Sequence, residues 1–136
     1  MRNFDFSRIV ALIVDDDADS RALTARVLSD VGATVIEADD AVAGMSSVQS
    51  STPNLLISDI GMASLDGYEL LRALREAGYD ESTLPAIALT AFSRMEDRVQ
   101  ALAAGFQEHL VKPLDPRLLI STVATLCRPA PTTPSG

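Results

Sequence analysis

Residues 54–67 of the chain read NLLISDIGMASLDG. The apolar run Leu55–Ile57 is typical of a short strand that is buried on both faces, and it leads directly into Ser58 and Asp59. In an open parallel sheet, ligands bind at the carboxyl ends of the strands. A carboxylate at such a place is costly unless it coordinates or reacts with something. We therefore expect Asp59 to accept a phosphoryl group, which requires a metal site, a counter-charge and a switch from other parts of the chain.

Length and composition favour one packed domain. The chain has 136 residues, of which 47% are hydrophobic. Its longest apolar run, Ile9–Val14, is far too short to span a bilayer, and its first residues do not resemble a secretion signal. A single cysteine, Cys127, cannot form an internal disulfide, so a cytoplasmic location is expected. The net charge of −8 disfavours binding to nucleic acid and to anionic membranes.

Five strand-like runs alternate with five helix-like runs, which predicts right-handed βαβ units. The fold expected is α/β, a flavodoxin-like doubly wound parallel sheet of five strands in the order 2-1-3-4-5, in a single domain. The strands are expected at Ile9–Val14, Thr34–Glu37, from Leu55, at Ala86–Thr90 and at Glu108–Val111. Residues 1–128 would form the domain, and the Pro/Ser/Thr-rich residues 129–136 would be a disordered tail or the start of a linker.

The helices are recognised by apolar residues at helical spacing and by their end signals. They are expected at Ala18–Val31, after Asp39 or Asp40, from before Leu70 to Gly78, from a cap at Ser93 to Gly105, and from Asp115 and Pro116 onward. In the fourth helix, the residues expected to face the core are Met95, Val99 and Leu102. In the last helix they are Leu119, Val123 and Leu126.

With this strand order, four neighbouring strand ends carry polar side chains. They are Asp15 and Asp16, Asp59, Thr90 and Lys112. Three carboxylates in one crevice raise one another's pKa unless a cation neutralises them, and oxygen ligands beside a phosphate suit Mg²⁺. A carboxylate can attack phosphorus to form an acyl phosphate, while the metal and a lysine neutralise the transferred group.

The motifs around these residues make the interpretation more specific. They are VDDD at Val14–Asp17, SDIGMASLDGYEL at Ser58–Leu70, ALTA at Ala88–Ala91 and VKP at Val111–Pro113. In this order and spacing the sequence from about Ile9 to Leu126 resembles a response-regulator receiver domain of two-component signalling. It most resembles receivers attached to hybrid sensor histidine kinases.

The resemblance implies a role for each residue of the metal site. Asp59 would be the phospho-acceptor and would bind Mg²⁺ (or Mn²⁺) directly together with Asp16. Asp15 would act mainly through water, and Gly61 would contribute its backbone carbonyl. The phosphoryl donor would be a phosphohistidine on a sensor histidine kinase or a histidine phosphotransfer protein.

The resemblance also implies a switch. Lys112 would pair with the phosphoryl group, and the peptide bond between Lys112 and Pro113 would be cis. Thr90 would move toward the phosphoryl group, and His109 would rearrange into the vacated space. The face made by the fourth helix, the fifth strand and the fifth helix would then change for a downstream output protein or attached domain. The chain would be a signalling domain rather than an enzyme, and its oligomeric state is left open.

Three positions depart from the family pattern. Ala63 stands where a loop proline is usual, and His109 stands in place of the usual Tyr or Phe of the switch. Phe92 lies beside the expected acyl phosphate, where it would limit the access of water and lengthen the phosphorylated lifetime, while Gly61 would leave the other side open. If it is buried, His109 adds a possible pH sensitivity.

Other interpretations remain for the same residues. The acidic run Asp15–Asp17 alone would suit a helix N-terminus, and it is a poor calcium loop because Ser20 replaces the required glycine. A haloacid-dehalogenase-like phosphatase would use Asp15 as nucleophile, but no later acidic pair holds its metal. A flavodoxin-type cofactor carrier is disfavoured by the acidic first loop. A pseudo-receiver would share the fold without turning over phosphate, although it usually lacks one of the residues found here.

Overall fold

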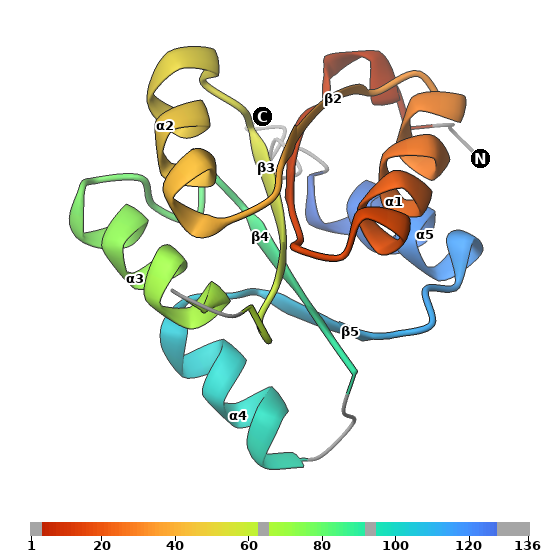
Figure 1. The fold of residues 1–136 in the computed structure, drawn as a ribbon. Helices are drawn as coiled ribbons and strands as arrows, with labels where there is room; N and C mark the ends of the chain where they lie inside the picture. The colour runs from red at the N-terminus through yellow and green to blue at the C-terminus, as the bar shows by residue number, and fades with distance from the viewer. Residues whose placement is uncertain (1–3, 63–65, 92–94, 128–136) are drawn as a thin grey trace, which may run out of the picture.

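The computed structural model describes residues 4–62, 66–91 and 95–127, and it shows a sheet with helices on both faces (Figure 1). Within these residues all five strands are parallel and lie in the order β2-β1-β3-β4-β5, as the sequence predicted. The strands are β1 (Val10–Val14), β2 (Thr34–Ala38), β3 (Leu55–Asp59), β4 (Ala86–Thr90) and β5 (Glu108–Val111). Each begins or ends within two residues of its predicted position.

Among the described residues, five α-helices connect or follow the strands. They are α1 (Ala18–Asp30), α2 (Ala41–Ser51), α3 (Gly67–Glu76), α4 (Met95–Ala104) and α5 (Pro116–Leu126). A short 3₁₀ helix, η1 (Phe6–Arg8), precedes β1 and has no counterpart in the sequence prediction. Aspartates cap four of the α-helices by accepting backbone N–H groups of the first turn; they are Asp17, Asp40, Asp66 and Asp115.

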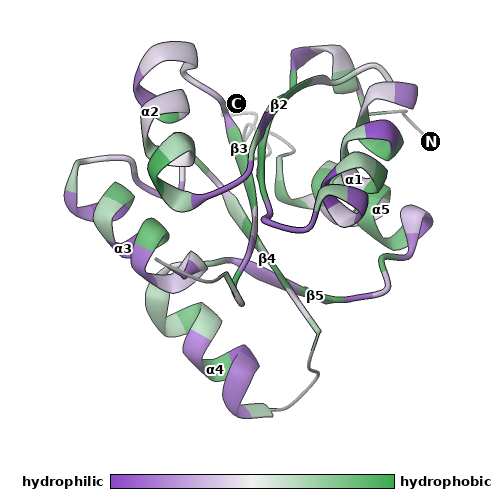
Figure 2. Cartoon of the chain, viewed as in Figure 1, coloured by the Kyte–Doolittle hydropathy of each residue, from purple (hydrophilic) through white to green (hydrophobic). Residues whose placement is uncertain are grey.

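The sheet separates two apolar cores. Helices α1 and α5 cover one face, where Leu28, Leu119 and Val123 pack on strand residues such as Ile57. Helices α2, α3 and α4 cover the other face, with Leu71 among the buried residues. Hydrophobic and hydrophilic residues alternate around the helices, as Figure 2 shows, because each helix buries only one side. The central strands β3 and β4 are fully buried, whereas the edge strands β2 and β5 carry exposed residues.

The prediction for the inner side of α4 was wrong. Its large apolar residues are exposed: Met95 by 74%, Val99 by 57% and Leu102 by 48%. The buried residues are instead Ala101 and Ala104, which lie on the opposite side of the helix together with the partly buried Asp97. Both sets recur with the same helical spacing, so periodicity alone does not decide which one faces the sheet. The small residues allow α4 to pack closely.

In α5 the prediction was confirmed for Leu119 and Val123, which are buried, and Leu126 packs against the same core. Several sequence expectations fall outside the described residues: those for Ala63, Phe92, the cap at Ser93 and the tail 129–136. Within the part of the chain that the structure describes, no helix combines the length and the apolar character needed to cross a membrane.

Candidate functional site

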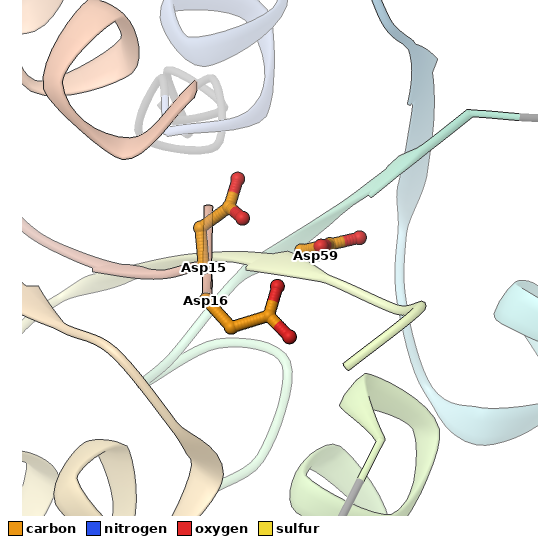
Figure 3. Close-up of side chains that lie close together, drawn as sticks. All are labelled: Asp15, Asp16 and Asp59. Atoms are coloured by element: carbon orange, nitrogen blue, oxygen red, sulfur yellow. The ribbon is translucent and has the colours of Figure 1, made fainter. Parts of the chain in front are cut away.

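Three aspartates meet at the carboxyl ends of β1 and β3. Asp15 and Asp16 directly follow β1, and Asp59 is the last residue of β3, its neighbour in the sheet. One carboxylate oxygen of each residue lies within 4.8 Å of those of the other two. Figure 3 shows the three side chains gathered at this edge. Because the strands are parallel and adjacent, the fold alone brings these charges together.

The aspartates differ strongly in exposure. Asp15 is fully buried, Asp59 is 8% exposed and Asp16 is exposed. The turn after β1 explains this difference, because Asp15 Oδ1 accepts the backbone N–H of Asp17 at 2.9 Å. Arg21 donates to the Asp15 carbonyl at 2.7 Å and fixes the backbone at the same point. The side chain of Asp15 is therefore held in the protein interior, whereas that of Asp16 faces solvent.

Lys112 supplies the counter-charge. Its Nζ lies 3.0 Å from Asp15 Oδ2 and 3.5 Å from Asp59 Oδ2. Burial disfavours the charged ammonium, but the hydrogen bond to Asp15 and the charge of Asp59 outweigh burial and raise the pKa of Lys112. The cis peptide bond between Lys112 and Pro113 is present, as the family resemblance implied.

The carboxyl of Asp59 is less easily ionised than an ordinary aspartate. Burial raises its pKa, and the nearby charge of Asp15 adds to this effect. The N–H of Gly61, which donates to Asp59 Oδ1 at 3.0 Å, and the ammonium of Lys112 act in the opposite direction. A hard cation among the three carboxylates would complete the neutralisation that Lys112 begins, and oxygen donors are the ligands that such a cation prefers.

Thr90 and His109 lie on neighbouring strands. Thr90 ends β4, is 3% exposed and pairs in register with Val111, while Ala88 pairs with His109. Side chains two residues apart on a strand share a face, so Thr90 and His109 are on the same side of the sheet. His109 is half-buried, and burial lowers the pKa of its imidazole.

Sequence reasoning missed how closely Gly67 approaches the acceptor. A Cβ atom at this position would lie 2.6 Å from the carbonyl oxygen of Asp59 and 2.9 Å from the Cα of Ile60. Helix α3 therefore begins in direct contact with the end of β3. The only signal in the sequence was the glycine after the capping Asp66, which does not by itself reveal the contact.

Comparison with known proteins agrees with this arrangement. The uncharacterized 14.6 kDa protein in the sodA1 3′ region of Leptolyngbya boryana is 47% identical over 85% of this chain and 88% of that protein. Response regulator MprA of Mycobacterium ulcerans is 38% identical over 86% of this chain and 49% of its own length, so the chain spans about half of that relative.

Among solved structures, the Vibrio cholerae chemotaxis protein CheY4 matches with a TM-score of 0.81 and 29% identity, over 87% of this chain and 98% of that one. The family description of the response regulator receiver domain matches residues 11–124. The chain therefore belongs to the response regulator receiver domains of two-component systems.

Proposed function

We propose that Asp59 accepts a phosphoryl group from a phosphohistidine on a sensor histidine kinase or a histidine phosphotransfer protein. The observation that supports this most directly is the contact of Lys112 with both Asp15 and Asp59 beside the exposed Asp16. Such a group of carboxylates and one ammonium is poorly suited to structural packing, but it suits a reaction that brings in an anion and a cation.

The metal would be Mg²⁺, or Mn²⁺ in its place. Asp16 and Asp59 would bind it directly, Asp15 would act mainly through water, and Gly61 would offer its backbone carbonyl. Support comes from the three carboxylate oxygens that lie within 4.8 Å of one another. The bound ion would neutralise the non-bridging oxygens of the phosphoryl group.

The chain's own groups would carry the transfer. A carboxylate oxygen of Asp59 forms the bond to phosphorus as the bond between phosphorus and the donor's imidazole nitrogen breaks, and the released imidazole takes up a proton. Lys112 pairs with the incoming charge, for which its position 3.5 Å from Asp59 Oδ2 is suitable. The ammonium of Lys112 would remain charged throughout the transfer, because Asp15 and Asp59 raise its pKa.

The response would be a two-state shift of the face made by α4, β5 and α5. Thr90 moves toward the phosphoryl group, and His109 rearranges on the neighbouring strand. Phosphorylation shifts this equilibrium only by interacting differently with the two states, which here means through Thr90 and Lys112. A downstream output protein or an attached domain would read the changed face.

Three finer proposals accompany this function. Phe92 and Gly61 set the phosphorylated lifetime by limiting or allowing water access, the chain acts in the cytoplasm, and it most resembles receivers attached to hybrid sensor kinases. The chain would form and lose its own aspartyl phosphate without turning over an external substrate. Replacing Phe92 by Ala should speed dephosphorylation, and an unchanged rate would contradict the role of Phe92.

The test is incubation with acetyl phosphate and Mg²⁺ followed by intact mass measurement. The expected result is a mass gain of one phosphoryl group that is absent in Asp59→Asn and in the presence of EDTA. Asp19→Asn, which removes an exposed carboxylate from the first turn of α1, should keep the gain. An equal gain in Asp59→Asn would refute the assignment, and hydrolysis of a generic phosphate ester would favour a phosphatase with Asp15 as nucleophile.

A further inference from the structure

Helix α4 carries a partly buried carboxylate on the side that faces the core. Asp97 shares its side of the helix with the buried Ala101 and Ala104. Its Oδ2 atom is buried and has no hydrogen-bond partner within residues 4–62, 66–91 and 95–127. A buried carboxylate oxygen without a donor is uncommon, and it calls for a physical explanation.

A second buried polar atom without a partner belongs to the strand on which α4 packs. Nε2 of His109, on β5, is also buried and lacks a hydrogen-bond partner in the described part of the chain. Helix α4 and β5 are in contact, and the charge of Asp97 acts on the imidazole. The two atoms are complementary, since the imidazole offers a donor once it is protonated and the carboxylate is an acceptor.

The charged groups around the ring act in opposite directions. Burial lowers the pKa of His109 and Arg98 adds to this effect, whereas Asp97 favours the protonated form. On β4 the residue opposite His109 is Ala88, which does not titrate, and the adjacent Glu108 is exposed. On α3 the hydroxyl of Tyr68 donates to the backbone carbonyl of Asp97 at 3.3 Å, so this turn of α4 is also fixed from the other side.

Protonation changes the hydrogen bonds that the His109 imidazole must make. Both ring nitrogens of an imidazolium carry a proton, so the buried Nε2 must then donate a hydrogen bond. Asp97 Oδ2 lacks a donor, and an ionised acceptor gives the stronger, charge-assisted bond. A neutral ring can carry its single proton on the other nitrogen, and it then makes no charge-assisted bond to Asp97.

We propose that Asp97 and His109 form a pH-dependent ion pair between α4 and β5. The protonated imidazole donates from Nε2 to the Asp97 carboxylate and holds the ring against α4, and loss of the proton releases the ring. The effect of this ion pair on signalling rests on the proposed function, because the His109 ring is the one that rearranges when Thr90 moves. Acidification therefore opposes the switch, and by reciprocity phosphorylation lowers the proton affinity of His109.

The pairing is tested by titrating His109 with proton NMR. His109 is the only histidine in the chain, so its ring signal needs no assignment. Asp97→Asn should shift the titration to lower pH and Arg98→Gln should shift it to higher pH. Glu96→Gln removes the same charge from the neighbouring exposed residue and should have a much smaller effect. Asp97→Asn is nearly isosteric, and thermal melts establish that each variant is folded.

An unchanged titration in Asp97→Asn, or an equal shift in Glu96→Gln, overturns the pairing. Should Asp97→Asn fold poorly, Asp97→Ala replaces it as the test of the pairing, and its titration should also shift to lower pH. The regulatory consequence is tested by repeating the titration with acetyl phosphate and Mg²⁺ while intact mass reports phosphorylation. A mass gain with an unchanged titration overturns the coupling alone. The absence of a mass gain refutes the proposed acceptor function, and the titration of the variants still decides the pairing.

Discussion

At the scale of single residues, the site contains the same side chain in three environments. Asp15 is buried and bonded to Lys112, Asp16 is exposed, and Asp59 is nearly buried with a raised pKa. Lys112 lies against both Asp15 and Asp59, and Asp16 keeps its contact with water. Burial and the charge of Asp15 disfavour the ionised form of Asp59, so a cation bound at this edge would favour it.

The raised pKa of Asp59 makes a prediction about stability. The folded state binds a proton at Asp59 more readily than the unfolded chain does, so ionised Asp59 destabilises the fold at neutral pH. This penalty disappears as the pH falls through the pKa of the folded state. Asp59→Asn should therefore raise the free energy of unfolding at neutral pH by about 1 kcal/mol, a typical size for one substitution. The gain should shrink toward ~pH 4, where the unfolded carboxyl also becomes protonated.

Urea denaturation in metal-free buffer at both pH values measures this difference. Asp16→Asn is the control, because the exposed Asp16 has little desolvation to relieve and should change stability less. A lower stability of Asp59→Asn at neutral pH would show that the contact with Lys112 outweighs burial and repulsion.

Gly67 is the residue that ties α3 to the acceptor. An added Cβ would meet backbone atoms of Asp59 and Ile60 at 2.6 and 2.9 Å, and backbone cannot rotate away as a flexible side chain can. Gly67→Ala should cost about 1–3 kcal/mol of stability, as overpacking does elsewhere. It should also slow phosphorylation by acetyl phosphate, because Asp59 itself must shift.

Chemical denaturation and the rate of mass gain test this expectation for Gly67→Ala. Gly61→Ala is the matched control for stability, since the nearest atom to its Cβ is Asp59 Oδ1 at an ordinary 3.8 Å. A Gly67→Ala variant as stable as the parent would mean that α3 can move away from β3 at no cost.

At the scale of elements, the sequence predicted the strand order and the gathering of the three aspartates and Lys112 better than it predicted α4. Continuous apolar runs such as Leu55–Ile57 favour a buried strand, and adjacent parallel strands bring their carboxyl ends together. The position of Asp59 beside Asp15 and Asp16 follows from these two features. In helix α4 both the large apolar residues and the alanines recur at helical spacing. Only packing against the sheet decides that Ala101 rather than Val99 is buried.

Contacts that depend on tertiary structure left no comparable signal in the sequence. Arg75 is the clearest case, because its guanidinium lies partly buried between elements that are distant in the chain. It donates to the carbonyl oxygens of Tyr79 at 3.0 Å, Leu84 at 2.7 Å and Gly105 at 3.0 Å. It therefore joins the end of α3 to the segment before β4 and to the end of α4. An isolated arginine in a helix sequence does not reveal such a role.

Removing the Arg75 guanidinium should destabilise the fold. Arg75→Met retains much of the apolar stem but deprives three carbonyl groups of a donor, and we expect a loss of about 2–4 kcal/mol. Arg72→Met, on an exposed position of the same helix, should change stability by no more than about 0.5 kcal/mol. Thermal and urea unfolding measure both variants. Equal stability of the two would show that water replaces the guanidinium without cost.

At the scale of the whole molecule, the fold concentrates charge at one edge. The chain carries a net charge of −8, and three of its carboxylates meet where β1 and β3 end. The sheet leaves these groups little room to separate, since Asp15 and Asp59 are buried at the ends of the adjacent strands β1 and β3. Their mutual repulsion is therefore stored in the native state and is relieved on unfolding. Only ligands that add positive charge at this edge can remove it without unfolding the chain.

Binding of Mg²⁺ should for this reason stabilise the entire domain. A ligand that binds only the folded state at a free concentration of 100 times its dissociation constant adds about 2.7 kcal/mol. Thermal melts with increasing Mg²⁺ should shift upward in the parent chain, and the shift should weaken as the pH falls, because the raised pKa of Asp59 lets protons compete with the metal. Asp16→Asn should lose most of the shift. Asp19→Asn, an exposed acidic change of equal charge outside the cluster, should keep it. Equal shifts in these two variants would mean that Mg²⁺ acts only by screening the net charge, and that the three carboxylates do not form a metal site.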